Sequence, residues 1–365
     1  MHDYRIERTA SIPKDELAGF FKAAYSDRFN APGCKEDDRI MDLWEWANLK
    51  NPNILPGQFP AWVCRKNSDN KIVGHFAVIP VSIKFKDSSY PAVWCRDLIV
   101  LPEYRKSGIG TFLVNTVLKD TVDKSCIFMV AGGNEKSHAI FLKSGFTDMG
   151  YIPLYIRVNR LDRLGIFGKA LLNIFYLPSF LIRLRGRNSG KTVIKEITHF
   201  DESFDKLWEE ASTPLPIVIN RTAAALNWRF VDQPYGAYKI FKAEDGSDKS
   251  PKGYIVLREG ESKGLRVGII SDLFADADDA STVGSLLDFA ITYFEDKGNT
   301  CLTRCDILND KFERVLRRSG FMRIRSSSHF MITNLRGDLD PEFAARRNNW
   351  FIDYADSDLD LSGKR

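Results

Sequence analysis

The stretch Asp97-Leu-Ile-Val-Leu-Pro-Glu-Tyr-Arg-Lys-Ser-Gly-Ile-Gly-Thr-Phe-Leu113 decides the fold of this chain. Leu98 to Leu101 form an uninterrupted apolar run of the kind found in buried strands, and Pro102 ends that run. Apolar residues recur at helical spacing from Phe112 onward, so a helix begins near residues 108–111. The stretch therefore predicts a strand, a turn that contains two glycines, and a helix.

The predicted turn is suited to an anion. The first N–H groups of a helix have no intrahelical acceptor, and the helix dipole is positive there. Gly108 and Gly110 let the backbone approach a ligand closely, and Arg105 and Lys106 add positive charge. The turn predicts a phosphate or pyrophosphate site, and an ordinary strand-to-helix loop is the alternative.

The pattern Val100-x-Pro-x-Tyr-Arg105-x-x-Gly108-Ile-Gly110-x-x-Leu113 resembles the acyl-coenzyme A loop of the GNAT acyltransferase superfamily. The signature of that superfamily is Arg or Gln, two residues, Gly, one residue, and Gly or Ala. The third glycine of a Rossmann fingerprint and the Gly-Lys-Ser/Thr of a Walker loop are both missing. The resemblance implies an α/β fold, a mixed sheet with helices on both faces, and acetyl-CoA or another acyl-CoA as co-substrate.

A second motif lies at Asn134-Glu-Lys-Ser-His-Ala-Ile-Phe-Leu-Lys-Ser-Gly-Phe146, a short helix with Asn134 as its N-cap and Gly145 as its stop. It resembles the second acyl-CoA element of the superfamily, in which two strands splay apart and the pantetheine arm pairs with the first. A Tyr often stands seven residues after the Asn, where this chain has Phe141. The cofactor-binding residues that the resemblance implies are Leu98, Ile99, Val100, Arg105, Lys106, Ser107, Gly108, Ile109, Gly110, Thr111, Asn134 and Phe141.

Two neighbouring residues are the candidates for catalysis. Asp97 is a carboxylate on the central strand and a candidate base, although the recurrence of Asp272 in the second half favours a structural role for both. Arg96 cannot accept a proton, but it could hold a phosphate or carboxylate of the acceptor, and an ion pair is the alternative. His75 and His138 are more often packed or surface residues than catalytic ones.

The second half repeats spacings of the first. Arg39, Trp46 and Pro52 are matched by Arg221, Trp228 and Pro234, Asp97 by Asp272, and Asn134 to Gly145 by Asn309 to Gly320. This repetition predicts two tandem GNAT-like domains. In place of the glycine turn the second copy has Asp276, Asp278 and Asp279, which would repel a pyrophosphate. We therefore expect a degenerate second copy that closes the acceptor cleft.

The predicted domains are an acyl-CoA-binding domain at 1–160, an apolar and basic connector at 161–190, the degenerate domain at 191–335 and an acidic, aromatic tail at 336–365. Residues 161–187 are interpreted as an interdomain connector, and the alternative is an amphipathic helix on an anionic membrane surface. The tail is interpreted as a frayed terminus. Its alternative is a segment that reaches back to the cleft, where its carboxylates attract an amine.

Composition sets the outer bounds. A net charge of +4 among 52 basic and 48 acidic residues implies no general affinity for nucleic acid. Six cysteines without Cys-x-x-Cys spacing or a paired histidine predict neither a metal site nor a disulfide framework. We expect a cytoplasmic protein, with a peripheral position at the inner face of the membrane as the alternative.

The functional prediction is an enzyme, a CoA-dependent N-acyltransferase. By the resemblance it moves an acetyl or other acyl group from acetyl-CoA to a primary amine of a small-molecule acceptor. Amino sugars or sugar nucleotides used in surface polysaccharide synthesis are the first expectation for that acceptor. The alternative is a catalytically impaired module that binds acyl-CoA, or a scaffold at a membrane surface.

Overall fold

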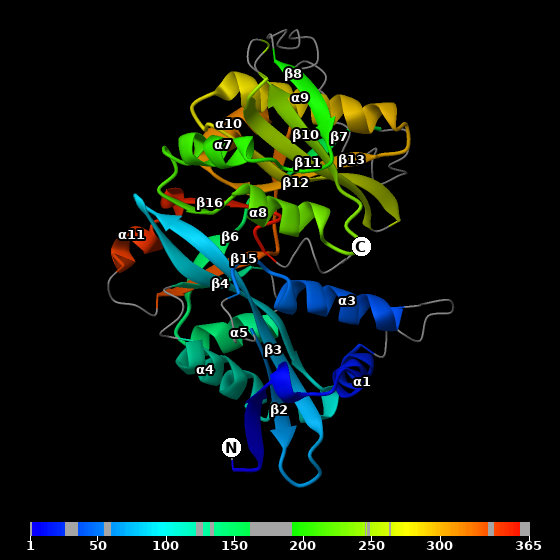
Figure 1. The fold of residues 1–365 in the computed structure, drawn as a ribbon, viewed down its shortest axis with the longest axis vertical. Helices are drawn as coiled ribbons and strands as arrows, with labels where there is room; N and C mark the ends of the chain where they lie inside the picture. Colours follow the sequence, from blue (N-terminus) through cyan, green and yellow to red (C-terminus); the bar gives the residue numbers. More distant parts are fainter. Residues whose placement is uncertain are drawn as a thin grey trace.

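The computed structural model describes residues 2–25, 36–54, 60–121, 127–131, 135–160, 192–244, 246, 249–262, 264–334 and 339–357. Asn134 and the connector predicted at 161–190 lie outside the described residues. One mixed sheet runs through the molecule, with helices on both of its faces (Figure 1). The predicted α/β class with a mixed sheet is therefore confirmed.

The first half alternates strands and helices in the order that the sequence predicts around residue 97. Its elements are β1 (Tyr4–Arg8), α1 (Lys14–Ala24), α3 (Glu36–Leu49), β2 (Ala61–Lys66), β3 (Ile72–Phe85), β4 (Ser88–Val100), α4 (Ile109–Thr121), β5 (Ile127–Ala131), α5 (Glu135–Lys143), β6 (Thr147–Tyr151) and β7 (Leu154–Val158).

The second half begins with a similar succession and ends with elements of its own. Its elements are β8 (Val193–Ile197), α7 (Ser203–Ala211), β9 (Ile217–Ile219), α8 (Ala223–Leu226), β10 (Lys239–Glu244), β11 (Pro251–Ser262), β12 (Leu265–Ala275), α9 (Ala280–Asp296), β13 (Leu302–Leu308), α10 (Asp310–Arg318), β14 (Met322–Ile324), β15 (His329–Asn334), α11 (Pro341–Ala345) and β16 (Trp350–Asp353).

The halves exchange their strands. β15 of the second half lies between β5 and β6 of the first half and pairs antiparallel with both. β7 of the first half lies in the same way between β13 and β14 of the second half. Each half therefore completes the sheet of the other, and the two cannot separate without breaking strand pairs.

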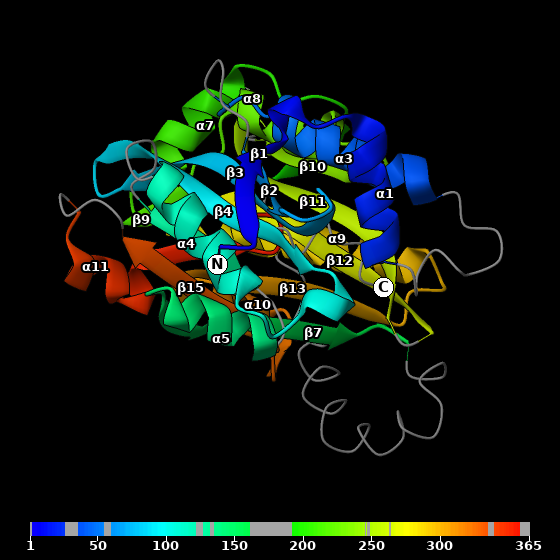
Figure 2. The ribbon, with the colours of Figure 1, turned by 90° about the horizontal axis from the view of Figure 1, so that it is seen from below.

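Successive side chains of the strands in the first half point to opposite faces of the sheet, and both sets are apolar. Helices therefore cover both faces. Val78, Val93 and Leu113 belong to a buried cluster under α4 and α5. Ala77 and Trp44 belong to a cluster under α1 and α3. Figure 2 shows the two helix pairs on opposite sides of the strands.

Two tryptophans at matching repeat positions join the halves. The rings of Trp46 and Trp228 stack with their centroids 4.5 Å apart and an interplanar angle of 9°. Trp46 Nε1 donates to the Trp228 carbonyl at 2.9 Å, and Trp228 Nε1 donates back to the Trp46 carbonyl at 3.3 Å. Both tryptophans are therefore packing residues at the contact between the halves.

The interpretation of the tail as a frayed terminus is wrong for its described part, 339–357. β16 pairs with β13 of the second half and with β9, which itself pairs with β3 of the first half. Trp350, Phe351 and Ile352 are at most 1% exposed. Apolar side chains at the first three positions of β16 are buried on both faces, so the described part of the tail belongs to the core between the halves.

Among the described residues, no helix is long and apolar enough to cross a membrane.

Candidate functional site

The central strand β4 is interrupted by a bulge at Asp97. Arg96 pairs with Ala77 and Ile99 pairs with His75, so Asp97 and Leu98 both lie opposite one residue of β3. The φ of Asp97 is +50°, in the left-handed region. A bulge of this kind turns a strand and redirects the residues that follow it.

β4 also parts from its parallel neighbour near this bulge. β4 and β5 pair only from Ala92 to Trp94. Beyond Trp94, in the part of the chain that the structure describes, no strand pairs with this edge of β4. The edge of Leu98 to Val100 is therefore open, as the resemblance implied for a strand that receives a pantetheine arm.

The predicted anion turn lies where β4 ends and α4 begins. Lys106 has φ +65° and Gly108 has φ +86°, and residues 105–108 are exposed. The Arg105 side chain donates from Nε to the Val100 carbonyl at 3.1 Å, which holds the turn against the strand end. A cation, two left-handed residues and the N-terminus of a 13-residue helix thus meet at one exposed place.

Gly110 serves helix packing. It is buried, and a Cβ at this position would lie 2.7 Å from Cδ1 of Ile140 on α5. Ile109, also buried, packs in the cluster under α4. Both residues therefore set the position of α4 beneath the turn.

Arg96 and Asp97 form an ion pair with each other. Arg96 Nε donates to Asp97 Oδ2 at 2.7 Å, and the Arg96 side chain is 9% exposed. Burial opposes ionisation of Asp97, but the charges of Arg96 and His75 outweigh it and keep the pKa of Asp97 below its ordinary value. A carboxylate with a lowered pKa is a weak proton acceptor.

Two buried donors on β4 lack acceptors among the described residues. They are Nε1 of Trp94, which is 0% exposed, and Nη1 of Arg96. Because residues two apart on a strand share a face, both donors lie on the side that carries Ile79, the partner of Trp94 on β3. An unmet buried donor is costly, so this pair marks a place that a polar ligand would stabilise.

Phe141, which was expected to contact the cofactor, lies in the core. It is 4% exposed, and its ring centroid lies 6.2 Å from that of Phe76 and 5.0 Å from that of Phe146. Position 141 is on the buried face of α5, where the ring packs above β3, and a cofactor contact for Phe141 stays a prediction. The role of Asn134 stays a prediction.

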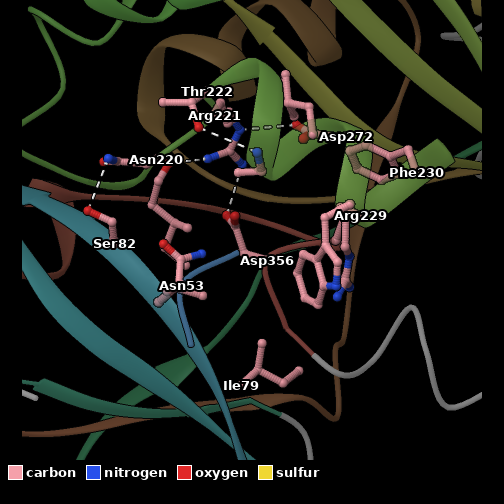
Figure 3. Close-up of a pocket in the computed structure, with 16 residues that line it drawn as sticks. Asn53, Ile79, Ser82, Asn220, Arg221, Thr222, Arg229, Phe230, Asp272 and Asp356 are labelled. Atoms are coloured by element: carbon pink, nitrogen blue, oxygen red, sulfur yellow. Dashed lines mark hydrogen bonds and ion pairs between the residues drawn. The ribbon is translucent and has the colours of Figure 1, made fainter. Parts of the chain in front are cut away.

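A pocket of about 80 Å³ lies between the halves (Figure 3). Its walls are Asn53, Ile79, Val81 and Ser82 from the first half and Ile219, Asn220, Arg221, Thr222, Ala225, Leu226, Trp228, Arg229, Phe230, Asp272, Ala355 and Asp356 from the remainder. Ile79 pairs with Trp94, the last residue of β4 that pairs with β5. The pocket is therefore one strand away from the point where β4 and β5 part, or about 5 Å.

Arg221 lies at the centre of a charged network in this pocket (Figure 3). It contacts Asp356 at 2.9 Å, Asp353 at 3.0 Å and Asp272 at 3.3 Å. The arginine is 3% exposed, and Tyr254 donates to Asp272 at 3.0 Å. Arg221 and Arg229 therefore stand beside the carboxyl groups of Asp272 and Asp356 in the lining of the pocket.

The carboxyl groups of the tail are the ones whose pKa values are raised. Burial raises the pKa of Asp356, Arg221 opposes the shift, and the negative charge of Asp272 adds to it. Burial and the neighbouring carboxylates raise the pKa of Asp353 further. A carboxylate with a raised pKa is a better proton acceptor than Asp97, and Asp356 borders the pocket directly.

His75 holds the bulge in place. Trp44 Nε1 lies 3.4 Å from His75 Nε2, and His75 Nδ1 lies 3.1 Å from the Asp97 carbonyl. Because the indole can only donate, Nδ1 carries the proton and donates to Asp97. Burial lowers the pKa of His75 to about 4, against weaker opposing effects from Asp97. His75 is thus a packed residue, as its sequence context indicated.

A pH-dependent stability follows from this burial. The folded pKa of His75 lies below the unfolded value of about 6.5, so its contribution is complete above that pH and is lost as the pH falls toward 4. We expect about 3 kcal/mol of the free energy of unfolding to depend on it. Urea unfolding should show a smaller fall between pH 7 and pH 4 in His75→Gln than in wild type. The exposed-histidine variant His199→Gln should keep the wild-type fall, and an equal fall in all three would contradict the assignment.

The sequence indicated some of this site and missed the rest. The structure places the turn at 105–111, Arg96 and the open edge of β4 along one strand and the helix that follows it, and their roles stay predictions. Asp356 and Arg221 were noted only as part of an acidic tail and a repeat. The signal that could have joined them is the aromatic run Trp350-Phe-Ile beside the acids, since such a run is typical of a buried strand.

The sequence and the structure both resemble known acyltransferases. Residues 21–146 match the family described as "Acetyltransferase (GNAT) family". None of the curated proteins matches the chain at a significant level.

Solved structures show the same fold over most of the chain. A GCN5-related N-acetyltransferase from Anabaena variabilis aligns with TM-score 0.61 at 12% identity, covering 91% of this chain and 73% of its own. The N-myristoyltransferase of Saccharomyces cerevisiae with bound myristoyl-CoA aligns with TM-score 0.59 at 12% identity, covering 92% and 83%. A GCN5-related N-acetyltransferase from Kribbella flavida gives 0.59 at 13% identity, covering 91% and 72%.

Proposed function

We propose, from the premise that this chain contains an acetyltransferase domain of the GNAT family, that the protein is a CoA-dependent N-acyltransferase. It transfers an acyl group from an acyl-CoA to a primary amine of a small acceptor held between the two halves. The observation that carries this proposal is the juxtaposition of the open β4 edge, the glycine turn before α4 and the charged pocket one strand away.

The residues present fit an acyl-CoA. The turn from Arg105 to Thr111 would take the pyrophosphate through backbone N–H groups, helped by the charges of Arg105 and Lys106. The open edge of Leu98 to Val100 would pair with the pantetheine amides. When bound, this co-substrate supplies the activated acyl group.

Different residues of the chain would then have different roles in acyl transfer. The carboxylates of Asp356 and Asp272 attract the ammonium form of the acceptor, and Asp356 takes a proton from it. Trp94 Nε1 and Arg96 Nη1 are free to donate to an oxygen at the splayed strands. We assign Asp97 to holding Arg96 in place, because its own pKa is lowered.

The second half would be a degenerate copy that binds no acyl-CoA. The Asp279 side chain accepts hydrogen bonds from the N–H groups of Ser281 and Thr282 at the start of α9. A capped helix start with further acids at 276 and 278 has no place for a pyrophosphate. Its part is to supply Arg221, Asp272 and the tail to the acceptor pocket.

The class of the acceptor can be tested by comparing candidate amines directly. Amino sugars and sugar nucleotides of surface polysaccharide synthesis remain our first proposal, because the pocket combines carboxylates for an amine with Arg229 for an anionic or hydroxyl-bearing group. Because the chain is similar in fold to an N-myristoyltransferase, a peptide N-terminus as acceptor and a long-chain acyl-CoA as donor are the substrates to compare with these. Membrane contact through 161–187 stays a prediction, since that segment lies outside the described residues.

A second candidate function is acyl-CoA binding without transfer. Two features favour it: Phe141 has no hydroxyl group at the position where the resemblance has a tyrosine, and Asp97 is held in an ion pair with Arg96. A thiol-release assay with wild type, acyl-CoA and each amine class separates the two functions. Binding without amine-dependent release of CoA would support the second.

The test of the cofactor site is calorimetric titration of acetyl-CoA and myristoyl-CoA into wild type and into a Lys106→Asp, Ser107→Asp variant. Both side chains are exposed, so the variant should fold. We expect one site per chain in wild type and an affinity at least about 30-fold lower in the variant, because about 2 kcal/mol of charge-assisted hydrogen bonding is lost.

Lys86→Asp is the matched control. Lys86 is an exposed lysine with φ +56°, similar to the +65° of Lys106, but it lies in the turn between β3 and β4. The Lys86→Asp variant should bind acyl-CoA with the affinity of wild type. Absence of binding to either acyl-CoA would remove both candidate functions, and equal affinity of all three proteins would place the site elsewhere.

A further inference from the structure

Two histidines and one aspartate meet at the junction of the exchanged strands, away from the pocket. His138 belongs to α5, Asp148 to β6 and His329 to β15, the strand that the second half inserts into the first. The sequence has no histidines paired at metal-binding spacing, and it is the fold that brings these two together. The two histidines are 191 positions apart, taking residue 329 minus residue 138.

The three ligand atoms already converge. His138 Nε2 lies 2.9 Å and His329 Nδ1 lies 3.0 Å from Asp148 Oδ2, and all three atoms lie within 4.8 Å of one another. Two ligands of a tetrahedral zinc ion with bonds of about 2.1 Å are about 3.4 Å apart, so a shift of about 0.4 Å would open these two separations to that distance. The side chains are 21%, 29% and 24% exposed in chain order, so an ion could enter and keep water ligands.

The surrounding backbone positions these three groups. The pairing of β15 with β6 shifts register between His329 and Met331, and this irregularity sets His329 across from the Asp148 side chain. The other oxygen of Asp148 accepts the Gly150 N–H at 2.8 Å, which fixes the carboxylate. Carboxylates that bind a metal ion are usually held in place by a hydrogen bond of this kind.

We propose that His138, Asp148 and His329 bind a divalent transition-metal ion such as zinc, which ties the inserted strand β15 to α5 and β6. Two imidazoles and one carboxylate form a donor set that zinc accepts with water in the remaining positions. The ion stabilises the strand exchange, because its ligands come from both halves. It also fixes α5, the helix that follows residue 134.

Other charges near the site set its strength. Burial opposes ionisation of Asp148, but hydrogen bonds from His138 and Gly150 and the nearness of His329 keep its pKa below the ordinary value, so it is a carboxylate ready for an ion. Arg347, which donates to the Met149 and Tyr151 carbonyls, is the neighbouring cation that would weaken binding. Three protein ligands beside an arginine bind less tightly than a closed four-ligand site.

The test is titration of Zn²⁺ into metal-free, full-length wild type, His138→Gln, His329→Gln and the control His199→Gln, whose exposed imidazole lies on the second half. Wild type and control should bind one equivalent, with a rise in Tm on the order of 5 °C at saturation. Each site variant should lose at least about 100-fold in affinity and the Tm rise with it. Circular dichroism of the metal-free proteins should be the same, because a partly exposed pair contributes little stability.

A spectroscopic measurement on wild type keeps the proposal testable if a site variant does not fold. The electron paramagnetic resonance of bound Cu²⁺ should show coupling to two imidazole nitrogens. No binding by wild type, equal binding by all four proteins, or a Cu²⁺ signal without nitrogen coupling would each overturn the proposal.

Discussion

Replacing Asp356 by asparagine should lower kcat for amine acylation by about 10²- to 10⁴-fold, the range for losing a positioned proton acceptor. Asparagine keeps an oxygen that can accept from Arg221 and from the Asp353 N–H, both of which now bond to Asp356 Oδ2 at 2.9 Å. The fold and the affinity for acyl-CoA should therefore stay the same. The loss should appear in kcat, measured by CoA release at saturating acyl-CoA.

The pH profile distinguishes a proton acceptor from a residue that only shapes the pocket. A protonated carboxyl cannot accept a proton, so the wild-type rate should rise with pH through the pKa of Asp356, which lies above the ordinary aspartate value. Asp356→Asn should lose this rise. Asp278→Asn, which changes an exposed acid on the second half, should keep both the rate and the profile. A wild-type rate in Asp356→Asn would remove Asp356 from the mechanism.

Replacing Arg221 by methionine should lower the free energy of unfolding by about 3–5 kcal/mol, because it leaves three buried carboxyl groups without their cation. Arg221 is almost fully buried, and its guanidinium also lies 4.8 Å from the Phe351 ring centroid. Chemical denaturation measures the loss. Arg39→Met is the matched control, since Arg39 holds the same repeat position but lies 5.2 Å over the Tyr235 ring at a half-buried site, where about 0.5–1 kcal/mol is expected.

The deficit of Arg221→Met should depend on pH with a defined sign. The pKa values of Asp353 and Asp356 are raised in the folded wild type, and loss of the arginine raises them further. The variant is therefore most stable below the unfolded aspartate pKa of about 3.9 and loses stability as the pH rises. Adding Asp356→Asn to Arg221→Met should recover part of the loss. Additive losses in the double variant would contradict direct coupling.

The strand, turn and helix at 97–113 could be predicted because the sequence patterns that indicate them are local. Pro102, the glycines at 108 and 110 and the apolar spacing after them all act within one strand, one turn and one helix. Propensity and periodicity report contacts of that range. The burial of Phe141 was not predicted, because spacing from Asn134 cannot tell which face of a short helix is buried.

The acceptor pocket required the tertiary structure. Arg221 and Asp356 are separated by 135 positions, and their ion pair exists only because β16 lies between β13 and β9. The acidic residues after Trp350 carry a composition signal that an exposed tail would share. Burial between the halves is what changed their pKa values and made Asp356 the proposed proton acceptor.

By itself the sequence determined the strand–turn–helix at 97–113, the α/β class and the resemblance to an acetyltransferase family, because each depends on residues close together in the chain. Tertiary structure alone decided the exchange of β7 and β15 and the meeting of His138 with His329. The physical reason is that strand insertion satisfies backbone hydrogen bonds, which are the same for every sequence. Side-chain patterns therefore do not record which half provides the partner strand.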